Sequence, residues 1–120
     1  MSRKAYLLDV LVVLAFAAAG RASHDLDGDV LGVLTTAWPF LVGMASGWAV
    51  VRLLPLPLRR WWAEGLFVVG DTFVIGMALR WITGGGTALP FVLVAAGVLT
   101  AGMLGWRLVE DLVSRRRRAA

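Results

Sequence analysis

The segment VLGVLTTAWPFLVGMASGWAVV, residues 30–51, contains no charged side chain. An apolar stretch of this length is typical of a helix that crosses the hydrocarbon core of a bilayer, which takes roughly 20 residues. Backbone amides and carbonyls find no water in that medium, so the segment is predicted to be helical. The chain is therefore predicted to be an integral membrane protein.

Three further apolar segments flank this one. The predicted spans are residues 5–22, 36–54, 63–82 and 87–109, followed by a basic cytoplasmic tail at 110–120. Pro55 and Pro57 predict a short, stiff connection between the second and third spans, because proline stops a helix and restricts the residue before it. Gly84–Gly86 separates the third span from the fourth. The predicted fold class is all-α, a single transmembrane four-helix bundle over residues 1–120.

The basic residues predict how the spans are oriented. Ten of the 12 Lys and Arg residues fall on one side of this arrangement, and only Arg21 and Arg80 fall on the other. Basic flanks stay cytoplasmic because Lys and Arg are disfavoured in translocated loops. The expected location is the cell membrane, with both termini cytoplasmic.

Composition excludes several other classes of protein. The apolar fraction of 59% and the mean hydropathy of +0.78 are far above the values of soluble domains. The net charge of +4 does not indicate nucleic acid as a partner, because the basic residues sit at segment ends without interleaved aromatic side chains. A cleaved secretory signal at the start is disfavoured because Asp9 interrupts the apolar run early.

An internal repeat divides the chain into two hairpins. The heptapeptide at 36–42, TAWPFLV, aligns with TALPFVL at 87–93, and a Gly-Trp pair follows in each half, at 47–48 and 105–106. Both copies enter the membrane from the same side, which predicts two parallel helical-hairpin repeats. In each copy the Thr is interpreted as a helix cap and the Pro as a residue of the first turn, so the second helix is predicted to begin near Thr36. Residues 23–35 then form an outer loop.

Small residues and tryptophans mark contact surfaces. Gly43-x-x-x-Gly47 and Ala101-x-x-x-Gly105 allow helix backbones to approach closely, and packing within the bundle is preferred over a dimer interface. Trp61, Trp62, Trp81 and Trp106 fall at predicted membrane interfaces and are interpreted as anchors there.

A candidate anion site lies at the outer ends of the spans. It comprises Arg21, His24, Arg80, Thr36 and Thr87, where two helix amino termini favour anions. The run Gly84–Gly86 would add an open backbone nest. The alternative is that both arginines contact lipid headgroups or neutralise Asp25, Asp27 and Asp29.

Two carboxylates fall inside predicted spans, and both are candidates for a proton or ion relay. Asp71 lies near mid-depth, where a charge is costly unless it is protonated, paired or wet. Asp71 and Arg80 lie on opposite sides of their helix, so another helix or water must supply the partner, with Thr72 or Thr100 in support. The alternative is a protonated Asp71 bonded to a neighbouring helix. Asp9 lies level with Arg52 and Arg107, and a structural salt bridge is its preferred role.

Catalytic and cofactor motifs are not found in the sequence. There is no cysteine, and His24 is the single histidine, so no metal site and no cofactor are expected. No catalytic triad, HExxH motif or Walker loop occurs, and the protein is predicted not to be an enzyme.

Several local motifs, from Asp9 to the closing Gly-Trp-Arg, resemble those of a known family. They are Asp9, Gly20-Arg21 with His24, Trp38-Pro39-Phe40, Gly76-Met77 with Leu79-Arg80, Gly86-Thr87-Ala88, and Gly105-Trp106-Arg107. The chain resembles, over about residues 5–110, a family of small prokaryotic four-span membrane proteins known only as a domain of unknown function. The resemblance implies a membrane helix bundle and supplies no catalytic residues.

Two functions are expected from these features. The first is a small oligomeric transporter or channel, with a possible outer anion site. The alternative is a non-transporting accessory or interaction subunit of a larger membrane complex. The expected partners are the lipid bilayer and either further copies of the chain or a membrane partner subunit.

Overall fold

The computed structural model describes residues 3–22, 30–58 and 60–119, apart from the side chains of Arg21 and Ala22. These residues form four helices, which are α1 (Arg3–Ala22), α2 (Val30–Leu53), α3 (Trp61–Ile82) and α4 (Leu89–Ala119). The predicted all-helical fold is confirmed.

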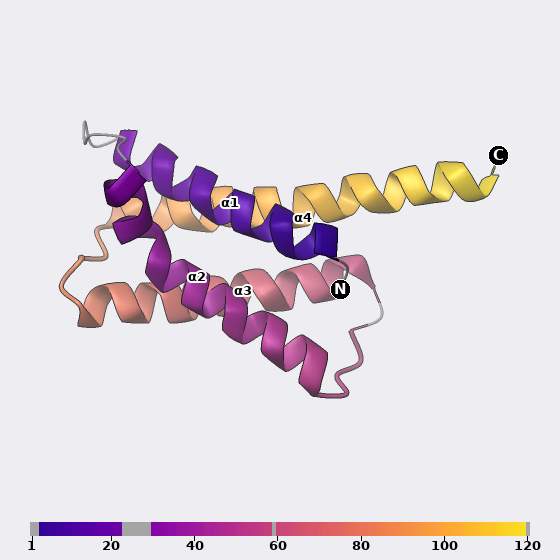
Figure 1. The fold of residues 1–120 in the computed structure, drawn as a ribbon, viewed down its shortest axis with the longest axis horizontal. Coiled ribbons are helices and arrows are strands. Elements are labelled where there is room, and N and C mark those ends of the chain that lie inside the picture. Colours follow the sequence, from indigo (N-terminus) through magenta and orange to yellow (C-terminus); the bar gives the residue numbers. More distant parts are fainter. Residues whose placement is uncertain (1–2, 23–29, 59, 120) are drawn as a thin grey trace.

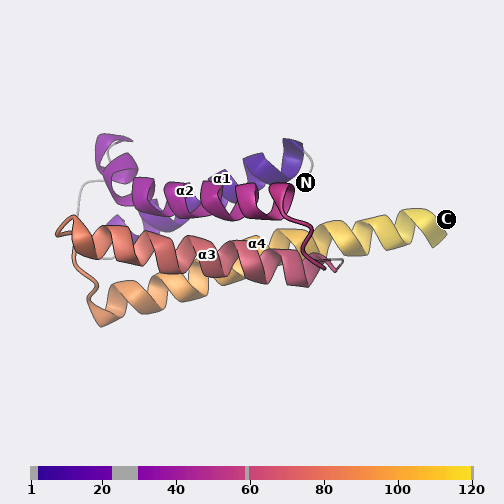
Figure 2. The ribbon, with the colours of Figure 1, turned by 90° about the horizontal axis from the view of Figure 1, so that it is seen from below.

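The helices run alternately up and down along the long axis of the molecule (Figures 1 and 2). Helix α1 packs against α2 and α4, and α3 packs against the same two helices, so the four form a closed ring. We call the end where α1 and α3 begin the basic end, because Lys4, Arg60 and Arg107 lie there. The opposite end, where α3 leads into α4, is called the loop end.

Three of the four helices, α2, α3 and α4, are long and apolar enough to cross a membrane. Helix α1 has 20 residues but carries Arg3, Lys4 and Asp9 in its first two turns. Its polar start explains why its sequence gives a weaker membrane signal than the other three.

Helix α2 begins earlier than predicted. It starts at Val30, so residues 30–35 are helical and the prediction of a loop there, with Thr36 as the cap, is wrong. Pro39 lies inside the helix and leaves the Thr35 carbonyl without its amide partner. Figure 1 shows the first turns of α2 bent away from the rest, as a proline in a helix causes.

Helix α4 is also longer than predicted. It has 31 residues and includes the arginines at 115–118, so the predicted tail continues the helix. At about 1.5 Å per residue its length is about 46 Å, well above the roughly 30 Å of a bilayer core. Its last turns project beyond the other helices at the basic end (Figure 1).

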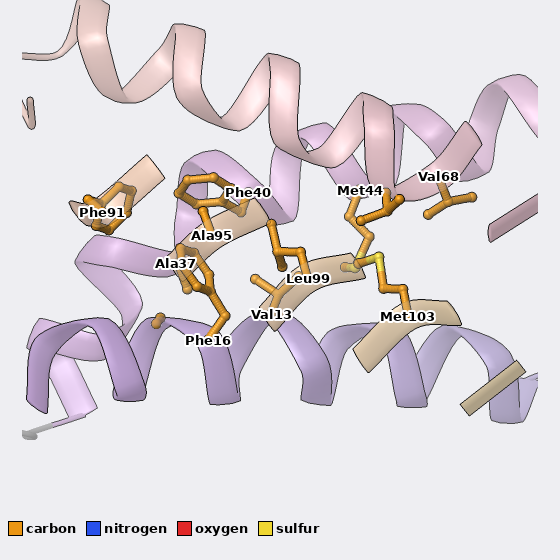
Figure 3. Packing of buried hydrophobic residues seen from close by; sticks show 12 residues of the cluster. Val13, Phe16, Ala37, Phe40, Met44, Val68, Phe91, Ala95, Leu99 and Met103 are labelled. Carbon is orange, nitrogen blue, oxygen red and sulfur yellow. The ribbon is translucent and has the colours of Figure 1, made fainter. Parts of the chain in front are cut away.

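The core is apolar and aromatic at the loop end and aliphatic at its centre. Phe16 of α1 makes edge contacts with Phe40 of α2 and Phe91 of α4, at ring-centroid distances of 4.9 and 5.5 Å. Figure 3 shows these rings at one end of the buried cluster, with Leu99 and Met103 farther along it. All are buried, so apolar side chains fill the interior where these helices meet.

The glycine motif of α2 is an internal packing surface, as predicted. A Cβ at Gly43 would lie 2.9 Å from the Thr72 carbonyl oxygen, and one at Gly47 would lie 3.4 Å from Asp71 Cβ. The second motif behaves differently. A Cβ at Gly105 would meet no atom within 4 Å, and Ala101 is exposed, so the prediction that it packs inside the bundle is wrong.

Candidate functional site

Asp9 of α1 lies at the centre of a buried polar cluster near the basic end. Its side chain is fully buried and accepts four hydrogen bonds. Oδ1 accepts from Trp106 Nε1 at 2.8 Å and from Arg107 Nη1 at 2.9 Å. Oδ2 accepts from Trp48 Nε1 at 3.0 Å and from Arg107 Nη2 at 2.9 Å. Both oxygens are therefore fully occupied.

Arg107 of α4 forms the other half of the cluster and is only 3% exposed. Its two Nη atoms bind Asp9 in the paired geometry that suits a guanidinium and a carboxylate. Nη1 also donates to the Met103 carbonyl at 3.0 Å, and Nε donates to Glu64 Oε1 at 3.3 Å. Each of the four helices therefore contributes to one network, through Asp9, Trp48, Glu64, and Trp106 with Arg107.

Electrostatics explains why this cluster tolerates burial. An isolated charge in an apolar interior is very costly, and pairing with complete hydrogen bonding offsets most of that cost. Arg107 lies between two carboxylates, of which Asp9 is enclosed and Glu64 keeps a side-chain exposure of 26%. The surplus negative charge is therefore placed where solvent can reach it.

A glycine in α3 makes room for the arginine. A Cβ at Gly65 would lie 2.5 Å from Leu104 Cδ2 and 3.1 Å from Arg107 Cδ. The sequence predicts that Asp9 lies at the same depth in the bundle as Arg52 and Arg107. The structure selects Arg107 and leaves Arg52 exposed, so the predicted salt bridge is confirmed.

The indoles of the cluster were not recognised from the sequence. Trp106 was interpreted as an interface anchor, but its N–H donates inward to Asp9 and its ring lies 4.5 Å from the Arg107 guanidinium carbon. The sequence pattern predicts no polar role for Trp48. The Gly-Trp pair occurs in both halves of the chain, and this repetition is the sequence feature that could have indicated a shared role for the two indoles.

Asp71 lies halfway along α3, at the interface with α2. Its Oδ2 is buried, faces Gly47, and has no hydrogen-bond partner among the residues that the structure describes. Thr72 donates to the Val68 carbonyl of its own helix at 2.6 Å, and Thr100 is exposed, so neither supports the carboxylate as proposed. Arg80 does not reach it either, as the helical geometry predicted.

Arg80 is engaged by the loop between α3 and α4. Its Nε donates to the Gly86 carbonyl at 2.7 Å, and its guanidinium carbon lies 3.9 Å from the centre of the Phe91 ring. The amides of Gly84 and Gly85 donate to the carbonyls of Trp81 and Arg80, which closes the end of α3. The glycine run is therefore a helix cap and not the open anion nest that the sequence suggested, with Gly84 and Gly86 both at φ 81°.

The remaining residues of the predicted anion site lie only partly in the described structure. Thr36 is buried inside α2, whereas Thr87 is exposed and precedes α4 by two residues. The Arg21 side chain and His24 lie outside the described residues, as do Asp25, Asp27 and Asp29. The anion site stays a prediction.

Groups of three or more potential metal ligands do not occur within residues 3–22, 30–58 and 60–119. The carboxylates of the cluster offer ion pairing and hydrogen bonding.

These features define a class of protein, a four-helix bundle with three membrane-compatible helices and a buried ion-pair network at one end. The chain belongs to the family described as Protein of unknown function (DUF3054), whose model matches residues 6–110. This match confirms the predicted resemblance to a domain of unknown function. No curated protein and no solved structure gave a significant match.

Proposed function

We propose that all four helices span the membrane and that the basic end faces the cytoplasm. Helix α1 packs against two membrane-compatible helices, and its one internal charge, Asp9, is paired with Arg107. Pairing removes the main obstacle to placing α1 in lipid. Lys4, Arg52 and Arg60 lie at the same end as the arginines of α4, which supports a cytoplasmic location for both termini.

Single cysteines test this topology, because the natural chain has none. Arg3→Cys, Leu54→Cys, Ala88→Cys and Ala119→Cys all lie at exposed positions. On intact cells an impermeant maleimide is expected to label only the Ala88→Cys variant, and the other three only after permeabilisation. Labelling of Arg3→Cys and Leu54→Cys on opposite faces would rule out four spans.

We further infer that the two hairpins are related repeats. Phe40 and Phe91 occupy matching places in the two heptapeptides, and both pack against Phe16. Trp48 and Trp106 belong to the two Gly-Trp pairs, and both donate to Asp9. The matched residues of α2 and α4 thus approach the same helix, α1, at the same two levels, which supports a relation between the two halves of the chain.

The function that this geometry supports best is proton transport by an oligomer. This proposal rests on Oδ2 of Asp71, which is buried at the α2–α3 interface and has no hydrogen-bond partner among the described residues. A carboxylate at mid-membrane costs about 2.5–3.5 kcal/mol when charged, so loss of its proton favours a rearranged interface that supplies water or a partner. Proton binding and helix movement are thereby linked. The filled core of one bundle favours a pathway formed between several copies.

Flux measurements in proteoliposomes test this function. Purified protein is reconstituted around a pH-sensitive dye, and proton entry is followed after a potential is imposed. We expect Asp71→Asn to lower the flux at least tenfold, because the amide cannot exchange a proton at neutral pH. Asp71→Glu is expected to keep part of the flux.

Glu110→Gln is the matched control, since it removes a carboxylate at the exposed pair with Lys4. Its flux is expected to equal that of the natural chain. Equal flux in Asp71→Asn, or no flux above that of protein-free vesicles, would exclude this function.

The outward face of α4 favours a second candidate, an accessory subunit. A Cβ at Gly97 or at Gly105 would meet no neighbour within 4 Å, and Ala101 between them is exposed. Small residues spaced by four suit close contact with another membrane helix. A chain without flux that co-purifies with a stoichiometric partner, and loses it in Ala101→Leu, would have this role.

A further inference from the structure

A cavity opens at the basic end, between the start of α3 and the last turns of α4. Its volume is about 530 Å³, and Arg107 lies in its wall. Trp61, Trp62 and Trp106 also line it, together with Arg60 and Arg118. A volume of this size is typical of sites for small molecules and headgroups.

The charges of the cavity wall do not balance locally. Each lining carboxylate has a cationic partner, since Glu64 binds Arg107, Glu110 binds Lys4 at 2.8 Å, and Asp111 binds Arg115 at 2.9 Å. Two lining guanidiniums, those of Arg60 and Arg118, form no ion pair or hydrogen bond with any residue in the described part of the chain. Four arginines and three carboxylates line the cavity, so its wall keeps one surplus positive charge, and the unpaired guanidiniums of Arg60 and Arg118 carry it.

The start of α3 adds to this positive potential. Arg60 is the residue before the helix and makes no side-chain cap, and the first intrahelical bonds run from the amides of Ala63 and Glu64 to its carbonyl. The amides of Trp61 and Trp62 precede these bonds at the positive end of the helix dipole. Arg60 thus lines the cavity at the amino terminus of α3, where the helix dipole also favours negative charge.

We propose that this cavity binds a phosphate ester with an apolar body. Arg60 and Arg118 bind the phosphate oxygens, because guanidinium groups match phosphate in both charge and hydrogen-bond geometry. The indoles of Trp61 and Trp62 contact the adjoining apolar part, as amphipathic rings do at a membrane interface. Basic pockets between membrane helices bind lipid headgroups in this way. The same chemistry recognises a soluble phosphate ester, and the proposal requires neither transport nor a particular orientation.

Binding is measured with purified protein and two probes. Phosphatidylglycerol is titrated in detergent and its stoichiometry counted by native mass spectrometry. Glycerol phosphate is titrated separately, with tryptophan fluorescence as the signal. We expect one molecule bound per chain, and we expect the double variant Arg60→Gln, Arg118→Gln to bind at least about tenfold more weakly, since charge-assisted hydrogen bonds are lost.

The matched control is Arg116→Gln, Arg117→Gln. It removes the same total charge near the basic end of the molecule, but neither residue lines the cavity. We expect less than a twofold loss of affinity. Both double variants are expected to melt like the natural chain, because none of the four side chains forms an ion pair or hydrogen bond with a described residue.

The two probes separate the sources of the phosphate. Binding of phosphatidylglycerol alone, lost only in the cavity variant, assigns the site to a lipid. Binding of glycerol phosphate with the same dependence assigns it to a soluble ester. Equal losses in the two double variants would show general attraction to a basic helix and overturn the proposal, as would the failure of both probes to bind the natural chain.

Discussion

Asp9→Asn is expected to destabilise the bundle by about 3–5 kcal/mol, the usual cost of removing one partner from a buried ion pair. The replacement has nearly the same volume, so the loss reports charge and hydrogen bonding and not a cavity. Arg107, only 3% exposed, would keep Glu64 and the Met103 carbonyl but lose its buried counter-charge. Thermal unfolding in detergent, followed by circular dichroism, measures the effect.

The exposed pair of Lys4 and Glu110 provides the control. Its nitrogen and oxygen lie 2.8 Å apart, but the two side chains are 64% and 48% exposed. Water screens such a pair, so Glu110→Gln is expected to leave the melting temperature almost unchanged. An Asp9→Asn variant that melts like the natural chain would contradict the role assigned to the cluster.

A double replacement tests whether the free energy of unfolding depends on the ion pair itself or on the charge left behind when one partner is removed. Asp9→Leu with Arg107→Met removes both charges, and apolar substitutes for a buried pair are often neutral or stabilising. We expect this variant to recover most of the stability that Asp9→Asn loses. The two indole N–H groups then lack their acceptor, which limits the recovery.

Gly43→Ala is expected to destabilise the contact between α2 and α3 by about 1–3 kcal/mol through overpacking. Its new Cβ would lie 2.9 Å from the Thr72 carbonyl oxygen and 3.1 Å from the Asp71 carbonyl oxygen. These are backbone atoms and cannot rotate away as a side chain could. The two helices must separate, which also loosens the interface that holds Asp71. Unfolding in detergent again measures the change.

The direction of the stability change distinguishes overpacking at Gly43 from the ordinary effect of replacing glycine by alanine in a helix. In a helix, alanine is ordinarily more favourable than glycine by about 1 kcal/mol. Gly97→Ala is the matched control, because a Cβ there meets nothing within 4 Å. We expect it to raise stability slightly or leave it unchanged. Stabilisation by Gly43→Ala as well would mean that the α2–α3 contact is less tight than the structure has it.

Much of the secondary structure could be predicted from local sequence. Apolar stretches bounded by charges, glycines and prolines marked all four helices, because each of these signals acts within a few residues. The errors have local causes too. Pro39 was interpreted as belonging to a first turn, although a proline inside an apolar helix bends it without ending it. The arginines at 115–118 suggested an irregular tail, yet they extend α4 to Ala119.

The site could be predicted only in part. The position of Asp9 in its span suggested two arginine partners, and one of them is correct. The indole donors and Glu64 could not be found, because they approach Asp9 and Arg107 from three different helices. Hydropathy cannot distinguish a tryptophan that anchors a helix at an interface from one that turns its N–H inward, since both lie near the end of a span.

Local sequence is enough to predict apolar helices with positive charge at one end of them, because hydropathy and charge act segment by segment. Which residues meet depends on the packing of the helices. The rotation and height of each helix depend on close contacts such as those at Gly43 and Gly65, where a missing side chain lets a neighbour approach. These contacts act on all four helices together. Only the packed bundle therefore pairs Arg107 with Asp9 and leaves Oδ2 of Asp71 without a described hydrogen-bond partner.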